Sequence, residues 1–192
     1  IQISWLGYFD TTGVAAVDYR IADEPSLPAA AERYFVERIV RLPRSANCFL
    51  PPSGPEPSAP PCSTAGRVTF GCFNNPAKIG RGVVAAFARV LRAVGGSQIL
   101  FKYLAFNEPA LCARYRGWFA EEGVPPERVH FEGPSSLERF QESFSRIDVA
   151  LDPFPYSGET TALHTLWMGV PLVAFEGPTL VQRLASRVLR VA

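Results

Sequence analysis

Beyond residue 66, the chain alternates between two kinds of apolar block. Short, wholly apolar runs predict buried strands, and longer stretches with apolar residues at 3.6-residue spacing predict helices. In 79–94, for example, Val83, Phe87 and Leu91 share one face while arginines fall between them. The expected strands are 68–73, 98–103, 129–131, 149–151 and 171–175, and the expected helices are 79–94, 107–123, 136–146, 160–168 and 178–190.

Two of these helices carry start signals. Asn107-Glu108-Pro109 combines a cap, an acidic residue and a first-turn proline, and Gly123 is a stop. Ser135 with Glu138 matches a capping box. We therefore expect helices to begin at these two points.

Strand–helix alternation, repeated five times, predicts an α/β fold with a doubly wound, Rossmann-like parallel sheet. The strands are apolar throughout, as expected when helices cover both faces of the sheet. With the common strand order 3-2-1-4-5, the first and fourth strands are neighbours where the order reverses. Ligands bind beyond the carboxyl ends of the strands at that point.

The preceding residues have a different character. Segment 51–66 is rich in Pro, Ser and Gly and reads as a linker. In 1–50 we expect strands in ISWLGY and VDYRIAD around a Thr11-Thr12-Gly13 turn, and a helix within 29–36. These elements are too few to close a core, so 1–50 is interpreted as the end of an incomplete domain and 67–192 as the sheet-containing lobe.

The composition argues against several classes of binding partner and site. The formal net charge is +1, which favours neither nucleic acid nor an anionic membrane as a partner, and no apolar run approaches the ~20 residues of a membrane span. The four cysteines lack CxxC spacing and nearby histidines, so we expect free thiols in a reducing, cytoplasmic setting and no metal. Because the first residue is Ile1, the chain is interpreted as an internal fragment.

The loop after the first predicted strand, FNNPAK, places amides and a lysine just before a helix. A phosphate there could accept hydrogen bonds from Asn75 and be neutralised by Lys78. The alternative is that Asn74 caps the helix and Lys78 is solvated.

The loop after the fourth predicted strand, DPFPYSGETT, leads into a helix. Gly158 permits close approach of the backbone, and Thr160 and Thr161 offer hydroxyls and first-turn N–H groups to an anion. The alternative is a capped helix after a rigid turn.

The chain lacks GxGxxG after the first strand and lacks GxxxxGK[ST], which argues against a dinucleotide fingerprint and a P-loop NTPase. A diphosphate site without these motifs points toward nucleotide-sugar transferases built from two Rossmann-like lobes.

Three motifs carry a family resemblance: WLGY, TTG and DYRIAD within 5–23, FGCFNNPAKI at 70–79, and DPFPYSGETTALHTLWMGVPLV at 152–173. They cover nearly the whole chain and resemble the O-GlcNAc transferase and SPINDLY family, above all its bacterial and SPINDLY-like branch. The resemblance implies a GT-B C-terminal lobe of an inverting glycosyltransferase. It would move a sugar from a donor such as UDP-GlcNAc to Ser or Thr of proteins, without a metal or other cofactor.

Residue roles follow from the same resemblance. Lys78 is implied to stabilise the leaving diphosphate as the catalytic residue. The remaining implied positions are Asn75, Gly158, Thr160 and Thr161 for the diphosphate, Ser135, Phe140 and His164 for the nucleoside, and Lys102 and Glu159 near the donor.

Three positions depart from the family pattern. Phe140 replaces a histidine near the base, His164 replaces an acidic residue at the ribose, and Glu159 would repel a diphosphate unless turned outward. The nucleotide therefore stays open. Alternatives are a GDP-fucose-dependent protein O-fucosyltransferase, a non-catalytic relative that binds a nucleotide sugar or a protein, and an unrelated sugar-nucleotide epimerase.

The acceptor side is expected in the missing part of the N-terminal lobe and in tetratricopeptide repeats that recruit protein or peptide substrates. The isolated chain is therefore expected to be inactive in transfer.

Overall fold

The computed structural model describes residues 1–192 and contains two parallel sheets. The larger sheet has five strands in the order β6-β5-β4-β7-β8. Numbered along this sheet, the order is 3-2-1-4-5, and the predicted doubly wound topology is confirmed. The strands are β4 (Thr69–Cys72), β5 (Gln98–Lys102), β6 (Val129–Glu132), β7 (Val149–Leu151) and β8 (Leu172–Val173).

Helices follow the strands at nearly the predicted places. The two start signals act one residue later than expected, because Glu108 and Ser136 are the residues whose side chains accept the first-turn N–H groups. The last predicted helix is divided by Arg183 into a short 3₁₀ turn and an α-helix. The helices are α2 (Arg81–Ala93), α3 (Pro109–Glu121), α4 (Leu137–Glu142), α5 (Thr160–Trp167) and α6 (Leu184–Val191).

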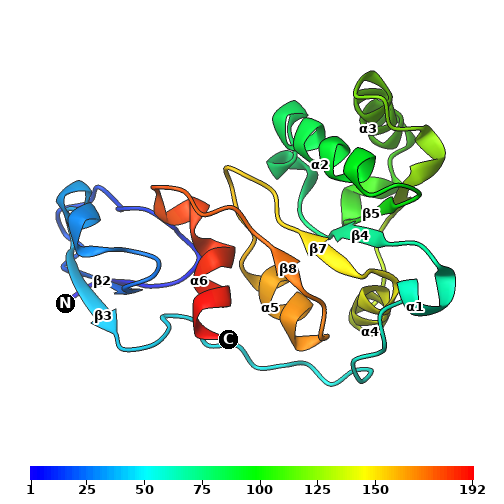
Figure 1. Cartoon of the computed structure of the whole chain (residues 1–192). Helices are drawn as coiled ribbons and strands as arrows, with labels where there is room; N and C mark the ends of the chain where they lie inside the picture. Colours follow the sequence, from blue (N-terminus) through cyan, green and yellow to red (C-terminus); the bar gives the residue numbers. More distant parts are fainter.

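The sheet is buried on both faces. Ile99 and Phe101 of β5 belong to a cluster of 17 buried apolar residues under α2 and α3, whereas Leu100 between them belongs to a second cluster of 7. Figure 1 shows α2 and α3 on one side of the sheet and α4 and α5 on the other. This arrangement explains why the strand sequences are apolar throughout rather than alternating.

The smaller sheet lies in the first 50 residues and consists of β1 (Ile3–Ser4), β2 (Tyr19–Asp23) and β3 (Arg38–Leu42). All its pairs are parallel, so the Thr11–Gly13 segment lies in a crossing connection rather than in a hairpin turn. The expected helix within 29–36 is a 3₁₀ helix (Ala29–Tyr34) without buried residues. Strand β3 was not predicted, because its sequence RIVRL carries arginines and lies at the sheet edge.

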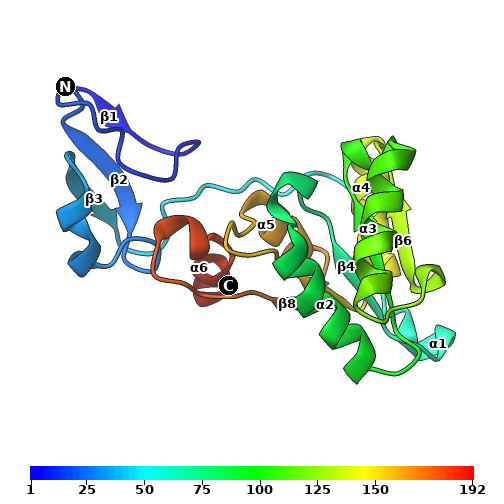
Figure 2. The same cartoon turned by 90° about the horizontal axis from the view of Figure 1, so that it is seen from above.

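The Pro-rich stretch runs along the lobe to a short helix, α1 (Cys62–Ala65), as Figures 1 and 2 show. Gly54 packs directly on the buried amide of Gln141, and the Cys62 N–H donates to Asp148 Oδ1 at 2.8 Å. In both views, α6 lies between the N-terminal sheet and α5.

Candidate donor site

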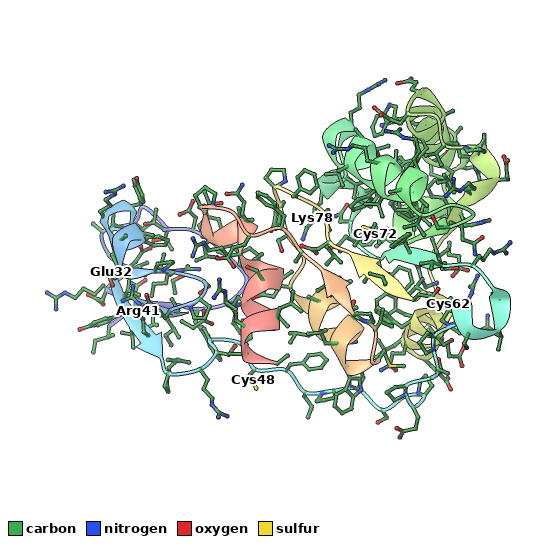
Figure 3. All side chains as sticks on the ribbon, viewed as in Figure 1. Glu32, Arg41, Cys48, Cys62, Cys72 and Lys78 are labelled. Atoms are coloured by element: carbon green, nitrogen blue, oxygen red, sulfur yellow. The ribbon has the colours of Figure 1, made fainter.

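The carboxyl ends of β4 and β7 bring the two candidate loops together. These strands are paired directly, with Phe70 opposite Val149 and Gly71 opposite Ala150. Beyond them, Lys78 Nζ donates to the carbonyl of Ser157 at 3.0 Å, and Thr161 Oγ1 donates to the carbonyl of Phe73 at 3.4 Å. Figure 3 marks Lys78 beside the loop that follows β7. The lysine and the start of α5 therefore share one rim of the sheet, as the strand order predicts.

Lys78 ends a 3₁₀ turn (Pro76–Lys78) that Asn75 caps, since Asn75 Oδ1 accepts from the Ala77 N–H at 2.9 Å. The cap is thus Asn75 rather than Asn74. Capping occupies the Asn75 oxygen and leaves its Nδ2 group to donate to a ligand.

The Lys78 ammonium is held mostly by neutral groups. Besides the Ser157 carbonyl, its partner is the ring of Tyr156, whose centroid lies 4.0 Å from Nζ. Burial lowers the pKa of Lys78, and the negative charge of Asp152 opposes that shift. An ammonium has three N–H donors, of which one is used here. The two remaining donors and the positive charge suit an anion.

Asp152 shapes the second loop. It is 5% exposed at the end of β7, and it accepts from the Gly158 N–H at 2.8 Å and from Ser157 Oγ at 2.6 Å. Burial raises the pKa of Asp152 to about 6, against the lowering effect of these hydrogen bonds and of Lys78. Sequence reasoning missed this residue, although an aspartate at the end of an apolar strand shortly before Ser-Gly was a usable signal.

Gly158 fits where a side chain would not. A Cβ atom there would lie 2.8 Å from Asp152 Oδ1 and 2.9 Å from Asn74 Oδ1. The close approach predicted for this glycine is therefore to the buried polar groups of the chain itself.

The first turn of α5 is open. Glu159 occupies the N-cap position but its side chain makes no capping hydrogen bond, and Thr160 is exposed. The Glu159 carboxylate instead accepts from Asn47 Nδ2 at 2.8 Å and from Arg187 Nη2. It is therefore turned away from the helix start, which is the condition under which a glutamate is compatible with a diphosphate there.

Two of the three nucleoside candidates lie together. The Phe140 and His164 rings meet edge to face with centroids 5.7 Å apart, and Phe49, which was not predicted, packs on His164 at 5.3 Å. Burial lowers the pKa of His164, and its Nδ1 atom has no hydrogen-bond partner.

Ser135 and Lys102 line another cleft. This polar cleft, about 650 Å³ in volume, is lined by none of the diphosphate candidates. Lys102 is 6% exposed and lies 3.3 Å from Glu132 Oε2, so its charge is already paired.

Three further features concern metal ligands, cysteines and membrane-spanning helices. No group of three or more His, Cys, Asp or Glu is placed to hold a metal ion, and all four cysteines are free. None of the helices has the length and apolar character required to cross a bilayer.

Comparison with known proteins identifies the family. A model of glycosyl transferase family 41 matches residues 64–191. The chain is 38% identical over 179 residues to a Petunia hybrida protein named probable UDP-N-acetylglucosamine–peptide N-acetylglucosaminyltransferase SPINDLY, and 38% identical over 180 residues to its namesake in Arabidopsis thaliana. Both matches cover 92% of this chain, which spans 19% and 20% of the length of these relatives.

Solved structures agree. An O-GlcNAc transferase mutant of Thermobaculum terrenum matches with a TM-score of 0.93 at 34% identity, over 99% of this chain and 36% of that one. Sucrose-phosphate synthase of Thermosynechococcus elongatus, at 18% identity and a TM-score of 0.54 over 92% of this chain and 49% of that one, shares the fold alone. Because the family model matches residues 64–191 and the relatives and the solved O-GlcNAc transferase share the sequence and the GT-B C-terminal lobe, the chain belongs to glycosyl transferase family 41.

Proposed function

We propose that this chain is the donor-binding part of an inverting glycosyltransferase that carries a sugar from UDP-GlcNAc to Ser or Thr of proteins. The observation that carries the proposal is the convergence of the Lys78 ammonium and the α5 N-terminus on one rim, joined by the 3.0 Å contact of Lys78 with Ser157. The names of the SPINDLY relatives support UDP-N-acetylglucosamine as the donor and a peptide as the acceptor.

The donor pyrophosphate is proposed to lie between these two groups. Lys78 supplies charge and free N–H donors, and the first turn of α5, which has no side-chain cap, supplies backbone N–H groups and the positive end of the helix dipole. The Thr160 hydroxyl is exposed beside them, whereas the Thr161 hydroxyl donates to Phe73, so that Thr161 offers its backbone N–H. Asn75 adds its Nδ2 group.

In the proposed reaction, the acceptor hydroxyl attacks the anomeric carbon from the face opposite the diphosphate. The bond from that carbon to the β-phosphate oxygen breaks, the configuration inverts, and the hydroxyl proton passes to the leaving diphosphate or to solvent. The negative charge that develops on the leaving diphosphate is stabilised by Lys78 and the α5 N-terminus, and one well-placed donor of this kind contributes about 3–4 kcal/mol. Because burial lowers the pKa of Lys78, an approaching diphosphate also favours its charged form. No metal or other cofactor enters the proposed reaction.

The nucleoside is proposed to lie toward Phe140 and His164, which meet at 5.7 Å on the same lobe. The protein acceptor is proposed to bind mainly through an N-terminal catalytic lobe and tetratricopeptide repeats, as the family resemblance implies.

Calorimetric titration of the 192-residue chain with UDP, GDP and UDP-GlcNAc tests the donor. We expect UDP to bind and Lys78→Ala to weaken it about tenfold or more, since a charge-assisted hydrogen bond contributes roughly 1.5–3 kcal/mol. Arg81→Ala is the matched control, because Arg81 is exposed at the start of α2 and pairs with Glu121. In an intact enzyme, Lys78→Ala should abolish transfer.

The outcomes separate the alternatives. Binding of GDP in preference to UDP points to fucosyl transfer, and binding of neither indicates a relative that acts through a protein partner. Near-normal UDP affinity of a folded Lys78→Ala variant would refute the role of Lys78.

A further inference from the structure

Glu159 is a charged residue in an unfavourable place for the proposed function. It immediately precedes the first residue of α5, where its carboxylate could either cap the helix or repel a bound diphosphate. It does neither in this structure, because both of its hydrogen bonds are directed to other parts of the chain.

Arg187 of α6 is the first restraint. It donates from Nη2 to Glu159 Oε1 and is itself only 5% exposed. Helix α6 contacts the loop between β7 and α5 at a second point, because the Ala185 N–H donates to Ser157 Oγ at 2.9 Å. Helix α6 therefore fixes the two residues that flank Gly158.

The N-terminal segment completes the restraint. Asp23, fully buried at the end of β2, has Oδ2 3.5 Å from Arg187 Nη1 and is itself held by the Ala46 N–H at 2.7 Å. The next residue, Asn47, donates to Glu159 at 2.8 Å. Two separate stretches of the chain thus donate to the Glu159 carboxylate, and a third, through Asp23, pairs with the arginine that does so.

The charges explain why this arrangement is needed. The Glu159 side chain is 15% exposed, and a carboxylate this poorly hydrated needs a partner. Without Arg187, the first turn of α5 offers N–H donors to Glu159, which already has the N-cap position of that helix. A carboxylate there would occupy the place of the diphosphate.

We propose that Arg187, oriented by Asp23 and assisted by Asn47, acts as a clamp that holds Glu159 away from the α5 N-terminus and so keeps that end of the helix open for the donor diphosphate. Arg187 and Asn47 are positioning residues that act through Glu159. The proposal rests on the proposed function, and it links the N-terminal segment to the affinity of the donor site.

The test is a cycle of variants of the full 192-residue chain, titrated with UDP and with uridine, which lacks phosphates. Arg187→Met should weaken UDP about tenfold, the scale of a partly buried charge at a helix end, and should leave uridine unchanged. Adding Glu159→Gln should restore UDP affinity to within about twofold of the wild-type chain, because the competing charge is gone. Glu159→Gln alone should tighten UDP by up to about threefold.

The control for Arg187→Met is Arg190→Met, on the same helix, where the arginine pairs with Glu176 at an exposed face and should not affect UDP. Since Arg187→Met leaves Asp23 buried without its cation, Asn47→Ala is a milder second probe. It should weaken UDP about threefold, and Glu159→Gln should reverse that loss as well.

Specific results would overturn the clamp. These are equal losses of UDP and uridine in the Arg187→Met and Asn47→Ala variants, no rescue by Glu159→Gln, or weaker UDP binding by Glu159→Gln alone. If the wild-type chain binds neither UDP nor GDP, both the proposed donor site and the clamp are refuted. If the wild-type chain binds UDP but Glu159→Gln does not restore the affinity of the other variants, only the clamp is refuted.

Discussion

The N-terminal 50 residues and the lobe that follows are held together in different ways. The five-stranded lobe packs clusters of 17 and 7 buried apolar residues on its two faces. In the first 50 residues, the buried apolar side chains are only Ala22, Leu27 and Ala46, and the buried polar or charged ones are Arg20, Asp23, Ser26 and Glu37. The segment is therefore organised by hydrogen bonds and charges rather than by an apolar core.

Two buried carboxylates show the contrast most directly. In the lobe, burial dominates and raises the pKa of Asp152 to about 6. In the N-terminal segment, burial also opposes ionisation of Glu37, but hydrogen bonds from Thr12 and Thr11 outweigh it and lower the pKa to about 2. Folding therefore shifts the pKa of a buried carboxyl group upward in the lobe and downward in the N-terminal segment.

This difference determines what each region depends on. Apolar packing is non-directional, so the lobe is specified by its own periodic sequence. A hydrogen-bonded framework depends on a few exact partners, some of them distant, such as Arg187 of α6 beside Asp23. We therefore expect the largest single-residue losses of stability in the lobe. In the N-terminal segment, we expect the loss to depend on which hydrogen-bond or ion-pair partner is removed.

The largest effect is expected from Phe101→Ala. Phe101 is fully buried in β5 and contacts the Phe131 ring at 5.5 Å and the Tyr115 ring at 5.7 Å. Its truncation should lower the free energy of unfolding by about 3–5 kcal/mol in urea denaturation. Phe175→Ala, at a residue 54% exposed, is the control and should cost less than about 1 kcal/mol. Similar losses for the two variants would contradict an apolar core centred on β5.

The contrast also explains how much the sequence predicts. All five strands of the lobe and their order were predicted, because apolar runs record burial under helices on both faces. Strand β3 was missed, because RIVRL shows no such run and owes its place to backbone pairing with β2. Local pattern therefore predicts the region that apolar burial organises.

The candidate donor site likewise has one part that the sequence predicts and one part that it does not. The approach of Lys78 to the start of α5 follows from strand order and was predicted. The restraint of Glu159 by Asn47 and Arg187, 112 and 28 residues away, has no local signature. Lys102 and Ser135 line their own polar cleft, because Lys102 ends β5 and Ser135 follows β6, whereas the diphosphate candidates follow β4 and β7.

The second prediction concerns Asp152→Asn and the pH dependence of stability. Because the pKa of Asp152 rises from 3.8 to about 6 on folding, the folded state binds the proton more tightly. This group therefore makes stability fall as pH rises from about 4 to about 6, by up to about 3 kcal/mol. The variant should lack that decline. Urea unfolding between pH 4 and pH 7 tests it, and parallel curves for the two proteins would show that burial does not dominate at Asp152.

The smallest effect, and the sharpest test of the comparison, is expected from Glu37→Gln. The Glu37 carboxylate accepts from the Thr12 N–H at 2.6 Å and from the Thr11 and Thr12 hydroxyls at 2.7 and 2.5 Å. Its pKa is lowered by folding, so its contribution is complete above about 4.5 and is lost as pH falls toward 2. At pH 7 the variant should be less stable by about 2 kcal/mol, and the difference should shrink in acid.

Amide hydrogen exchange assigns that loss to the segment. Exchange at the Thr12 N–H should accelerate in Glu37→Gln, whereas exchange in β5 should follow only the change in global stability. Glu24→Gln is the matched control, since the Glu24 side chain is 65% exposed in its pair with Arg41 and should contribute less than about 1 kcal/mol. If Thr12 exchange is unchanged in Glu37→Gln, the carboxylate is not the centre of this framework, and apolar contacts must hold the first 50 residues as they hold the lobe.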